Sequence, residues 1–206
     1  MQFENAYVFH GDRFEYGSFC VRNGRFTDCL EPGEPVTDLQ GNRVIPGLID
    51  LHIHGAMAAD FSDGDLSGLT SMARHLARCG VTSFAPASMT LPYETLSKAY
   101  ETAKQFREKW NGQAARLMGI HMEGPFLSER KKGAQNAAYL QKPDAEAFFA
   151  LQESSGGLIR IADVAPEVPG ALEWIRAAAG SCTVSAAHTD ADYAEMMRAI
   201  DRRAHV

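Results

Sequence analysis

Two histidines separated by one residue, His52 and His54, stand where the apolar segment Val44 to Gly55 turns polar at alternate positions. Successive side chains of a β-strand point to opposite faces, so both imidazoles would share one face with Asp50. Their Cα atoms would lie roughly 7 Å apart, close enough for two neutral ring nitrogens to reach one zinc or iron ion. The spacing therefore favours a metal site over a pair of packed or solvated histidines.

Two further candidates, Glu123 and His188, lie far along the chain. Gly124 and Pro125 follow Glu123 and predict an abrupt turn straight after a carboxylate that could bind zinc or iron. Glutamate is mostly exposed in proteins, so chemistry alone favours a solvated or ion-paired side chain here. His188 precedes T-D-A-D, an N-cap pattern, and a ring packed near a helix start is its alternative role.

Three stretches resemble one family. P-G-L-I-D-L-H-I-H-G is similar to the first-strand motif of the amidohydrolase superfamily, metal-dependent hydrolases built on (β/α)8 barrels. H-M-E-G-P-F-L-S-E-R-K-K-G-A-Q-N and A-A-H-T-D-A-D-Y resemble the signature loop and the next metal-binding segment of N-acetylglucosamine-6-phosphate deacetylases. The resemblance spans essentially the whole chain but only about half of a family member, given the usual size of such a barrel.

The resemblance implies a hydrolase that removes the acetyl group from N-acetylglucosamine 6-phosphate in amino-sugar catabolism. It implies that Glu123 and His188 bind the catalytic cation and that His52 and His54 help to hold a second, giving one or two zinc or iron ions. It also implies a homodimer for the full-length protein. An amidohydrolase that acts on another small N-acyl substrate and a non-catalytic half-barrel that binds a sugar or a partner are the alternatives.

The signature loop also carries the substrate candidates. The resemblance implies that Ala134 and Gln135 lie against the amino sugar, although many family members have histidine at the position of Gln135. Lys131 and Lys132 could attract the phosphate, or they could be solvated surface lysines, which are the norm.

Three other polar residues at strand ends are interpreted as supporting groups. His121 would be a barrel-wall residue or a hydrogen-bond donor to a metal ligand. Asp163 and Glu167 would order neighbouring groups or loops, without a catalytic role.

The pattern of predicted elements that position these residues changes at Val44, from short strands to alternating strands and helices. Segments 3–9, 13–21 and 25–29 predict short strands, with an Asn23-Gly24 hairpin turn, and so a small β-sandwich part over residues 1–43. Residues 44–206 alternate between the two element types, with strands predicted at 44–54, 81–88, 115–121, 158–164 and 182–187 and helices at 65–79, 92–110, 144–154, 171–179 and 190–202. This α/β pattern predicts about five units of a (β/α)8 TIM barrel.

A barrel of this kind closes only with eight strands, so five would leave unpaired edges. The last residues resemble the run into the sixth strand of the family, and the family's acid/base aspartate is expected beyond Val206. We therefore expect an inactive fragment, and a natural half-barrel that dimerises through its edges is the alternative. His205 precedes the histidine expected on that strand and is given no ligand role.

Composition excludes several classes of protein. The chain has 206 residues, a net charge of −6 and no basic tract, which argues against nucleic-acid binding. It has no signal-peptide pattern and no apolar run of about 18 residues, so no membrane span is expected. Four cysteines, Cys20, Cys29, Cys79 and Cys182, lack C-x-x-C spacing, which predicts reduced thiols in a cytoplasmic protein.

Overall fold

The computed structural model describes residues 1–27, 33 and 35–205, and it divides into two compact units, Met1–Gly47 and Leu48–Val206. The predicted change from short strands to alternating strands and helices, at Val44, lies a few residues before this division. Cys29, a predicted reduced thiol, and Val206, at the entry to the expected sixth strand, lie outside the described residues.

The first unit is a small mixed sheet whose strand order is β3-β2-β1-β4, with β5 also pairing with β1. Its strands are β1 (Gln2–Phe9), β2 (Phe14–Arg22), β3 (Arg25–Thr27), β4 (Val36–Asp38) and β5 (Arg43–Val44). Asn23 and Gly24 join β2 to β3 with φ values of 53° and 72°, as the predicted hairpin turn requires. β4 and β5 pair parallel to β1 and were not predicted, because two or three residues are too few to show a periodicity.

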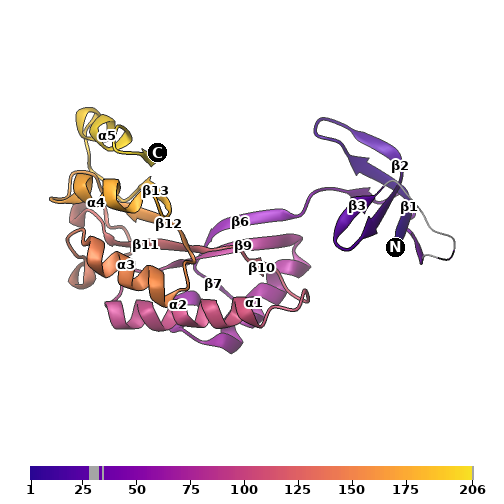
Figure 1. Ribbon diagram of the computed structural model, residues 1–206, viewed down its shortest axis with the longest axis horizontal. Coiled ribbons are helices and arrows are strands. Elements are labelled where there is room, and N and C mark those ends of the chain that lie inside the picture. The colour runs from indigo at the N-terminus through magenta and orange to yellow at the C-terminus, as the bar shows by residue number, and fades with distance from the viewer. Residues whose placement is uncertain (28–32, 34, 206) are drawn as a thin grey trace. The chain divides into compact units, whose positions relative to one another are not determined.

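The second unit is a curved, all-parallel sheet in which β6 and β9 lead to the order β9-β11-β12-β13-β14 (Figure 1). Its strands are β6 (Leu48–Ile53), β9 (Val81–Ser88), β10 (Arg116–Leu117), β11 (Ile120–Phe126), β12 (Ile159–Val164), β13 (Thr183–Ala186) and β14 (Ala204–His205). β10 and β11 follow one another beside β9, so the seven segments occupy six positions. This is the predicted partial barrel, and β14 adds the sixth strand that the chain was expected to approach.

The helices alternate with these strands, and each contacts the next along the chain. They are α1 (Leu66–Arg78), α2 (Tyr93–Glu108), α3 (Ala145–Ser154), α4 (Ala171–Ala178) and α5 (Tyr193–Ile200), with short 3-10 turns η1 (Phe61–Asp63), η2 (Glu129–Lys131) and η3 (Ala137–Tyr139) and a small hairpin of β7 (Gly55–Ala56) and β8 (Ala59–Asp60). Among the described residues, none of these helices is long and apolar enough to span a bilayer.

Local sequence explains where the helices begin and which face they bury. Asp192 caps α5 in a reciprocal box with Glu195, which confirms the N-cap role of T-D-A-D. In α1, the buried Leu69, Met72 and Leu76 recur at helical spacing and pack into the core. Helix and sheet thus bury one continuous apolar layer, and the polar ends of the strands are left to form the site.

The sequence prediction was wrong about the end of the third barrel strand. A turn was expected directly after Glu123, but β11 continues to Phe126. Its register against β12 shifts between Met122 and Phe126, so extra residues are accommodated in a bulge instead of ending the strand. Glu123 therefore lies within a buried strand and not in a loop.

Candidate metal centre

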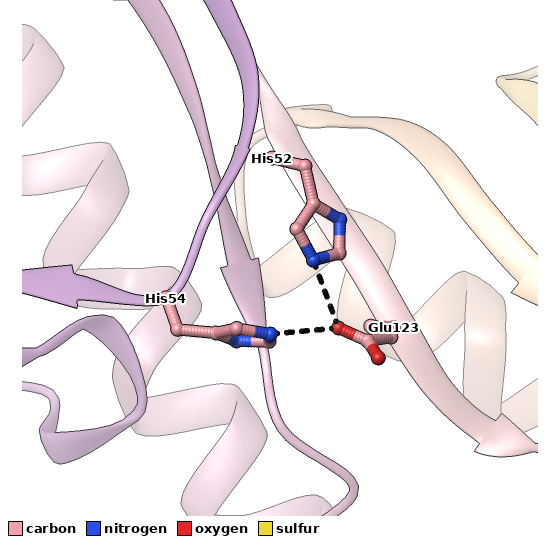
Figure 2. A group of neighbouring side chains, drawn as sticks. All are labelled: His52, His54 and Glu123. Carbon is pink, nitrogen blue, oxygen red and sulfur yellow. Dashed lines mark ion pairs between the residues drawn. The ribbon is translucent and has the colours of Figure 1, made fainter. Parts of the chain in front are cut away.

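The predicted ligand residues come from three barrel strands and converge at their carboxyl ends. His52 lies in β6, His54 directly follows it, and Glu123 lies in β11 (Figure 2). His188 comes two residues after the end of β13. The carboxyl ends of the strands are where α/β barrels place their reactive groups.

His52, His54 and Glu123 form a compact cluster in which one ligand atom from each residue lies within 4.8 Å of the others. Oε2 of Glu123 lies 3.2 Å from Nε2 of His52 and 2.9 Å from Nε2 of His54. Figure 2 shows both rings directed at this one oxygen. The Glu123 side chain is 6% exposed, so the carboxylate is almost fully removed from water.

The other carboxylate oxygen of Glu123 faces a different set of groups. Oε1 lies 2.6 Å from Nε2 of His188 and accepts a hydrogen bond of 2.9 Å from the side-chain amide of Gln135. Oε2 is buried and receives no hydrogen bond from any residue that the structure describes. All four predicted metal residues thus meet around a single carboxylate.

The hydrogen bonds of two rings determine which nitrogen faces the carboxylate. Nδ1 of His54 lies 3.1 Å from the carbonyl oxygen of Ala87, and Nδ1 of His188 lies 3.0 Å from that of Lys131. A carbonyl oxygen only accepts, so each Nδ1 carries a proton, and Nε2 is the ring nitrogen left to face the carboxylate or a cation. At these distances a positive charge must lie between Nε2 and the carboxylate oxygen, and either a proton on Nε2 or a bound cation supplies it.

This donor set fits a divalent cation of the zinc or iron type. Neutral imidazole nitrogens and a carboxylate are preferred ligands of such metals, and a backbone carbonyl on the far ring nitrogen is a common support. Oε2 of Glu123 is buried and accepts no hydrogen bond from the described residues, so a cation there would supply the partner that it lacks.

His52 is supported by two other buried residues. Its Nδ1 lies 3.2 Å from Nδ1 of His121, whose Nε2 lies 3.1 Å from Oδ2 of Asp163. Burial and the nearby His121 lower the pKa of His52 despite the opposing charge of Glu123, which favours the neutral ring that a metal needs. Burial also acts to lower the pKa of His121, but the hydrogen bond and charge of Asp163 outweigh it, and that pKa is raised.

The loop that carries His188 has an uncommon backbone conformation. His188 has a φ of 48°, in the left-handed region that residues other than glycine rarely adopt. Glu167 holds the following residues by accepting hydrogen bonds of 2.5 Å from Thr189 Oγ1 and 2.6 Å from the backbone N–H of Asp190. Glu167 therefore orders this loop, in line with its predicted supporting role.

The predicted substrate residues lie in the loop between β11 and α3 but differ in exposure. Ala134 is exposed in a turn, whereas Gln135 is 2% exposed and points inward at Glu123. Lys132 donates to the carbonyl oxygen of Gln135 at 3.0 Å, and Lys131 lies 3.4 Å from Asp190. Both lysines thus take part in holding this loop and the neighbouring one.

Thr90 and Ala87 belong to the surroundings of the site, and no motif or spacing predicted their contribution. The backbone N–H of Thr90 binds the side chain of Gln135, and the carbonyl of Ala87 orients His54. Both contributions come from backbone atoms, which every residue type except proline could supply at both positions.

Comparison with known proteins places this geometry in a family. Residues 43–206 match the model of the amidohydrolase family. N-acetylglucosamine-6-phosphate deacetylase from Bacillus subtilis is 39% identical over 154 residues, covering 73% of this chain and 39% of that protein. The human protein of the same name is 36% identical over 207 residues, covering 93% of this chain and 50% of its own length.

A solved structure agrees with these sequence relationships. The crystal structure of N-acetylglucosamine-6-phosphate deacetylase from Pasteurella multocida superposes with a TM-score of 0.86 at 26% identity, over 98% of this chain and 54% of that one. The chain therefore spans about half the length of the relatives it matches. On the match over residues 43–206, this chain belongs to the amidohydrolase family.

Proposed function

We propose that the protein to which this chain belongs removes the acetyl group from N-acetylglucosamine 6-phosphate, and that these residues contribute its metal centre. The observation that carries the proposal is the buried Glu123 carboxylate, whose two oxygens face His52, His54 and His188. The names of the relatives supply the substrate, and a related structure from Mycobacterium smegmatis, 27% identical, holds N-acetyl-D-glucosamine-6-phosphate.

In this proposal the residues of this chain hold the cation and orient the substrate. Glu123 would bind through both oxygens, while His54 and His188 would bind through Nε2, each ring fixed by a backbone carbonyl. A divalent cation held there would supply Lewis acidity and an activated water for amide hydrolysis. Ala134, exposed beside Gln135, would offer its backbone to the amino sugar.

The division of ligands between the two carboxylate oxygens favours two cation positions, one at Oε2 with His52 and His54 and one at Oε1 with His188. Zinc and iron are the proposed metals, because the set combines imidazole with carboxylate. We also propose that the whole protein is a homodimer, as the resemblance implies, and that it is cytoplasmic, as the scattered cysteines predict. We further propose that it does not act on nucleic acid, given the net charge of −6 of these 206 residues.

Metal binding is tested first, on the chain as written. Metal-free protein is titrated with Zn²⁺ or Fe²⁺, and bound metal is measured by elemental analysis after gel filtration. We expect one or two ions per chain and loss of binding in Glu123→Gln, with the exposed Glu153→Gln as the matched control. Equal metal content in all three proteins would refute the site.

Substrate choice is tested in the whole protein with a panel of N-acyl sugars, each with and without the 6-phosphate. We expect metal-dependent acetate release to be fastest with N-acetylglucosamine 6-phosphate. Preference for an unphosphorylated amide would support the alternative amidohydrolase, and a metal-free dimer without turnover would support a binding module. Assay of the 206-residue chain alone tests whether it is inactive by itself.

A further inference from the structure

Gln135 is a buried polar side chain within an otherwise exposed loop. It is 2% exposed, whereas its neighbours Ala134 and Asn136 are exposed. Its backbone N–H donates to the carbonyl oxygen of Lys132 at 3.1 Å, and Lys132 Nζ donates to its carbonyl oxygen at 3.0 Å. This tight turn directs the Gln135 side chain inward.

The hydrogen bonds of the Gln135 amide define its orientation. The backbone N–H of Thr90, just beyond the end of β9, donates to Gln135 Oε1 at 2.7 Å. A backbone N–H can only donate, so the atom facing it is the amide oxygen, and the amide nitrogen must face Glu123. Gln135 Nε2 then donates to Glu123 Oε1 at 2.9 Å.

This amide makes the two oxygens of the Glu123 carboxylate inequivalent. Oε1 accepts the hydrogen bond from Gln135 on one side and faces His188 on the other. Within the described part of the chain Oε2 accepts no hydrogen bond, and it faces His52 and His54. Rotation of the carboxylate about its last bond, out of its present plane, would break the hydrogen bond to Gln135 and turn the other oxygen away from His52 and His54. The amide is itself fixed by Thr90, so it resists this rotation.

We propose that Gln135 is a positioning residue that fixes the rotation of the Glu123 carboxylate and keeps Oε2 directed at His52 and His54. The inference rests on the proposed function to the extent that Glu123 binds a cation. It assigns Gln135 a role toward Glu123 in addition to any contact with substrate. Groups that orient a metal ligand typically contribute about 10–100-fold to metal affinity.

The test uses Co²⁺, whose visible absorption reports coordination geometry, titrated into the metal-free chain. Gln135→Met keeps the length of the side chain and removes both hydrogen bonds, and Gln135→Asn keeps the amide but is too short to bridge Thr90 and Glu123. Gln135→His restores a ring N–H donor. Gln141→Met, an exposed glutamine six residues along, is the matched control, and Glu123→Gln reports the metal site itself.

We expect Gln135→Met and Gln135→Asn to weaken Co²⁺ binding by about 10–100-fold and to change the absorption spectrum. Gln135→His should recover much of both, and Gln141→Met should match the unchanged protein. If Gln135→Met and Gln135→Asn leave the Co²⁺ affinity and spectrum unchanged while Glu123→Gln loses binding, the positioning role is overturned and the metal site is retained. Binding that survives Glu123→Gln would instead overturn the metal site and the positioning role together.

Discussion

Nε2 of His188 lies 2.6 Å from Oε1 of Glu123, although the two residues are 65 positions apart in the chain. Because Nδ1 of His188 donates to the carbonyl of Lys131, Nε2 is the ring nitrogen that faces Glu123. A positive charge between these two atoms stabilises the contact, and either a proton on Nε2 or a bound cation supplies it. The predictions below follow from this centre and from the groups that support it.

Replacing His188 with alanine should reduce the stabilisation of the folded protein by metal. A ligand at about 100 times its dissociation constant raises the free energy of unfolding by about 2.7 kcal/mol. At the same zinc concentration the free energy of unfolding of His188→Ala should rise by less than that of the unchanged protein, because one nitrogen donor is missing. Thermal unfolding with and without zinc measures the difference, and His10→Ala, an exposed histidine of the other unit, should respond like the unchanged protein. An equal gain in all three proteins would remove His188 from the site.

Asp163 should act on the metal through His121 and His52. Its carboxylate is buried at 3% exposure, and its Oδ2 lies 3.1 Å from Nε2 of His121. Asp163→Asn keeps the shape but removes the charge, and we expect metal affinity to fall by about 10–100-fold. Isothermal titration with Zn²⁺ measures it, with the exposed Asp201→Asn as control. A fall of the same size in both variants would show a general charge effect and no specific support of His52.

Gly124, next to the Glu123 carboxylate, should not tolerate a side chain. Its φ is 85°, and an added Cβ would overlap Oγ1 of Thr90. Gly80 has the same φ of 85°, and no atom of the described chain is recorded within 4 Å of an added Cβ there, so it is the matched control. We expect Gly80→Ala to cost about 1–2 kcal/mol from backbone strain and Gly124→Ala a further 1–3 kcal/mol, roughly, from overpacking. Urea unfolding measures both, and equal losses would contradict the close approach of Thr90.

The thiols should differ in reactivity and in their dependence on pH. Burial raises the pKa of Cys182 from 9.0 to about 11, despite the opposing effect of Ser181, whereas Cys79 is exposed. At pH 8 we expect iodoacetamide to modify Cys79 well before Cys182, because the thiolate is the reactive form. Peptide mapping by mass spectrometry after timed labelling measures each site. Equal labelling rates of Cys79 and Cys182 in the folded protein would contradict the burial of Cys182, provided that urea raises both rates equally.

The same shift in the pKa of Cys182 sets the sign of a stability effect. The unfolded chain releases this proton at lower pH than the folded chain, so the contribution of Cys182 is fully present below pH 9. It is lost as the pH rises from 9 toward about 11. Cys182→Ser should flatten the fall in unfolding free energy across that window, as measured by urea titrations at several pH values.

Sequence periodicity specified much of the barrel portion. Strand β9 spans Val81–Ser88, as predicted, and α1 begins after Asp65, whose side chain caps it. These elements have long repeating patterns with clear stop signals, which single residues cannot easily override. The end of β11 was predicted incorrectly because Gly124-Pro125 is a turn signal in the local sequence. The bulge that lets the strand continue depends on its pairing with β12, which the local sequence does not show.

The sequence by itself determined the types and spacing of His52, His54, Glu123 and His188, and with them the chemistry that a metal would meet. Only the tertiary structure decided that both oxygens of Glu123 are used and that backbone carbonyls of Ala87 and Lys131 select the ring nitrogens. It also decided that Gln135 turns inward to Glu123. The physical reason is that strand register and loop packing set these contacts, and many of them involve backbone atoms that are the same in every residue.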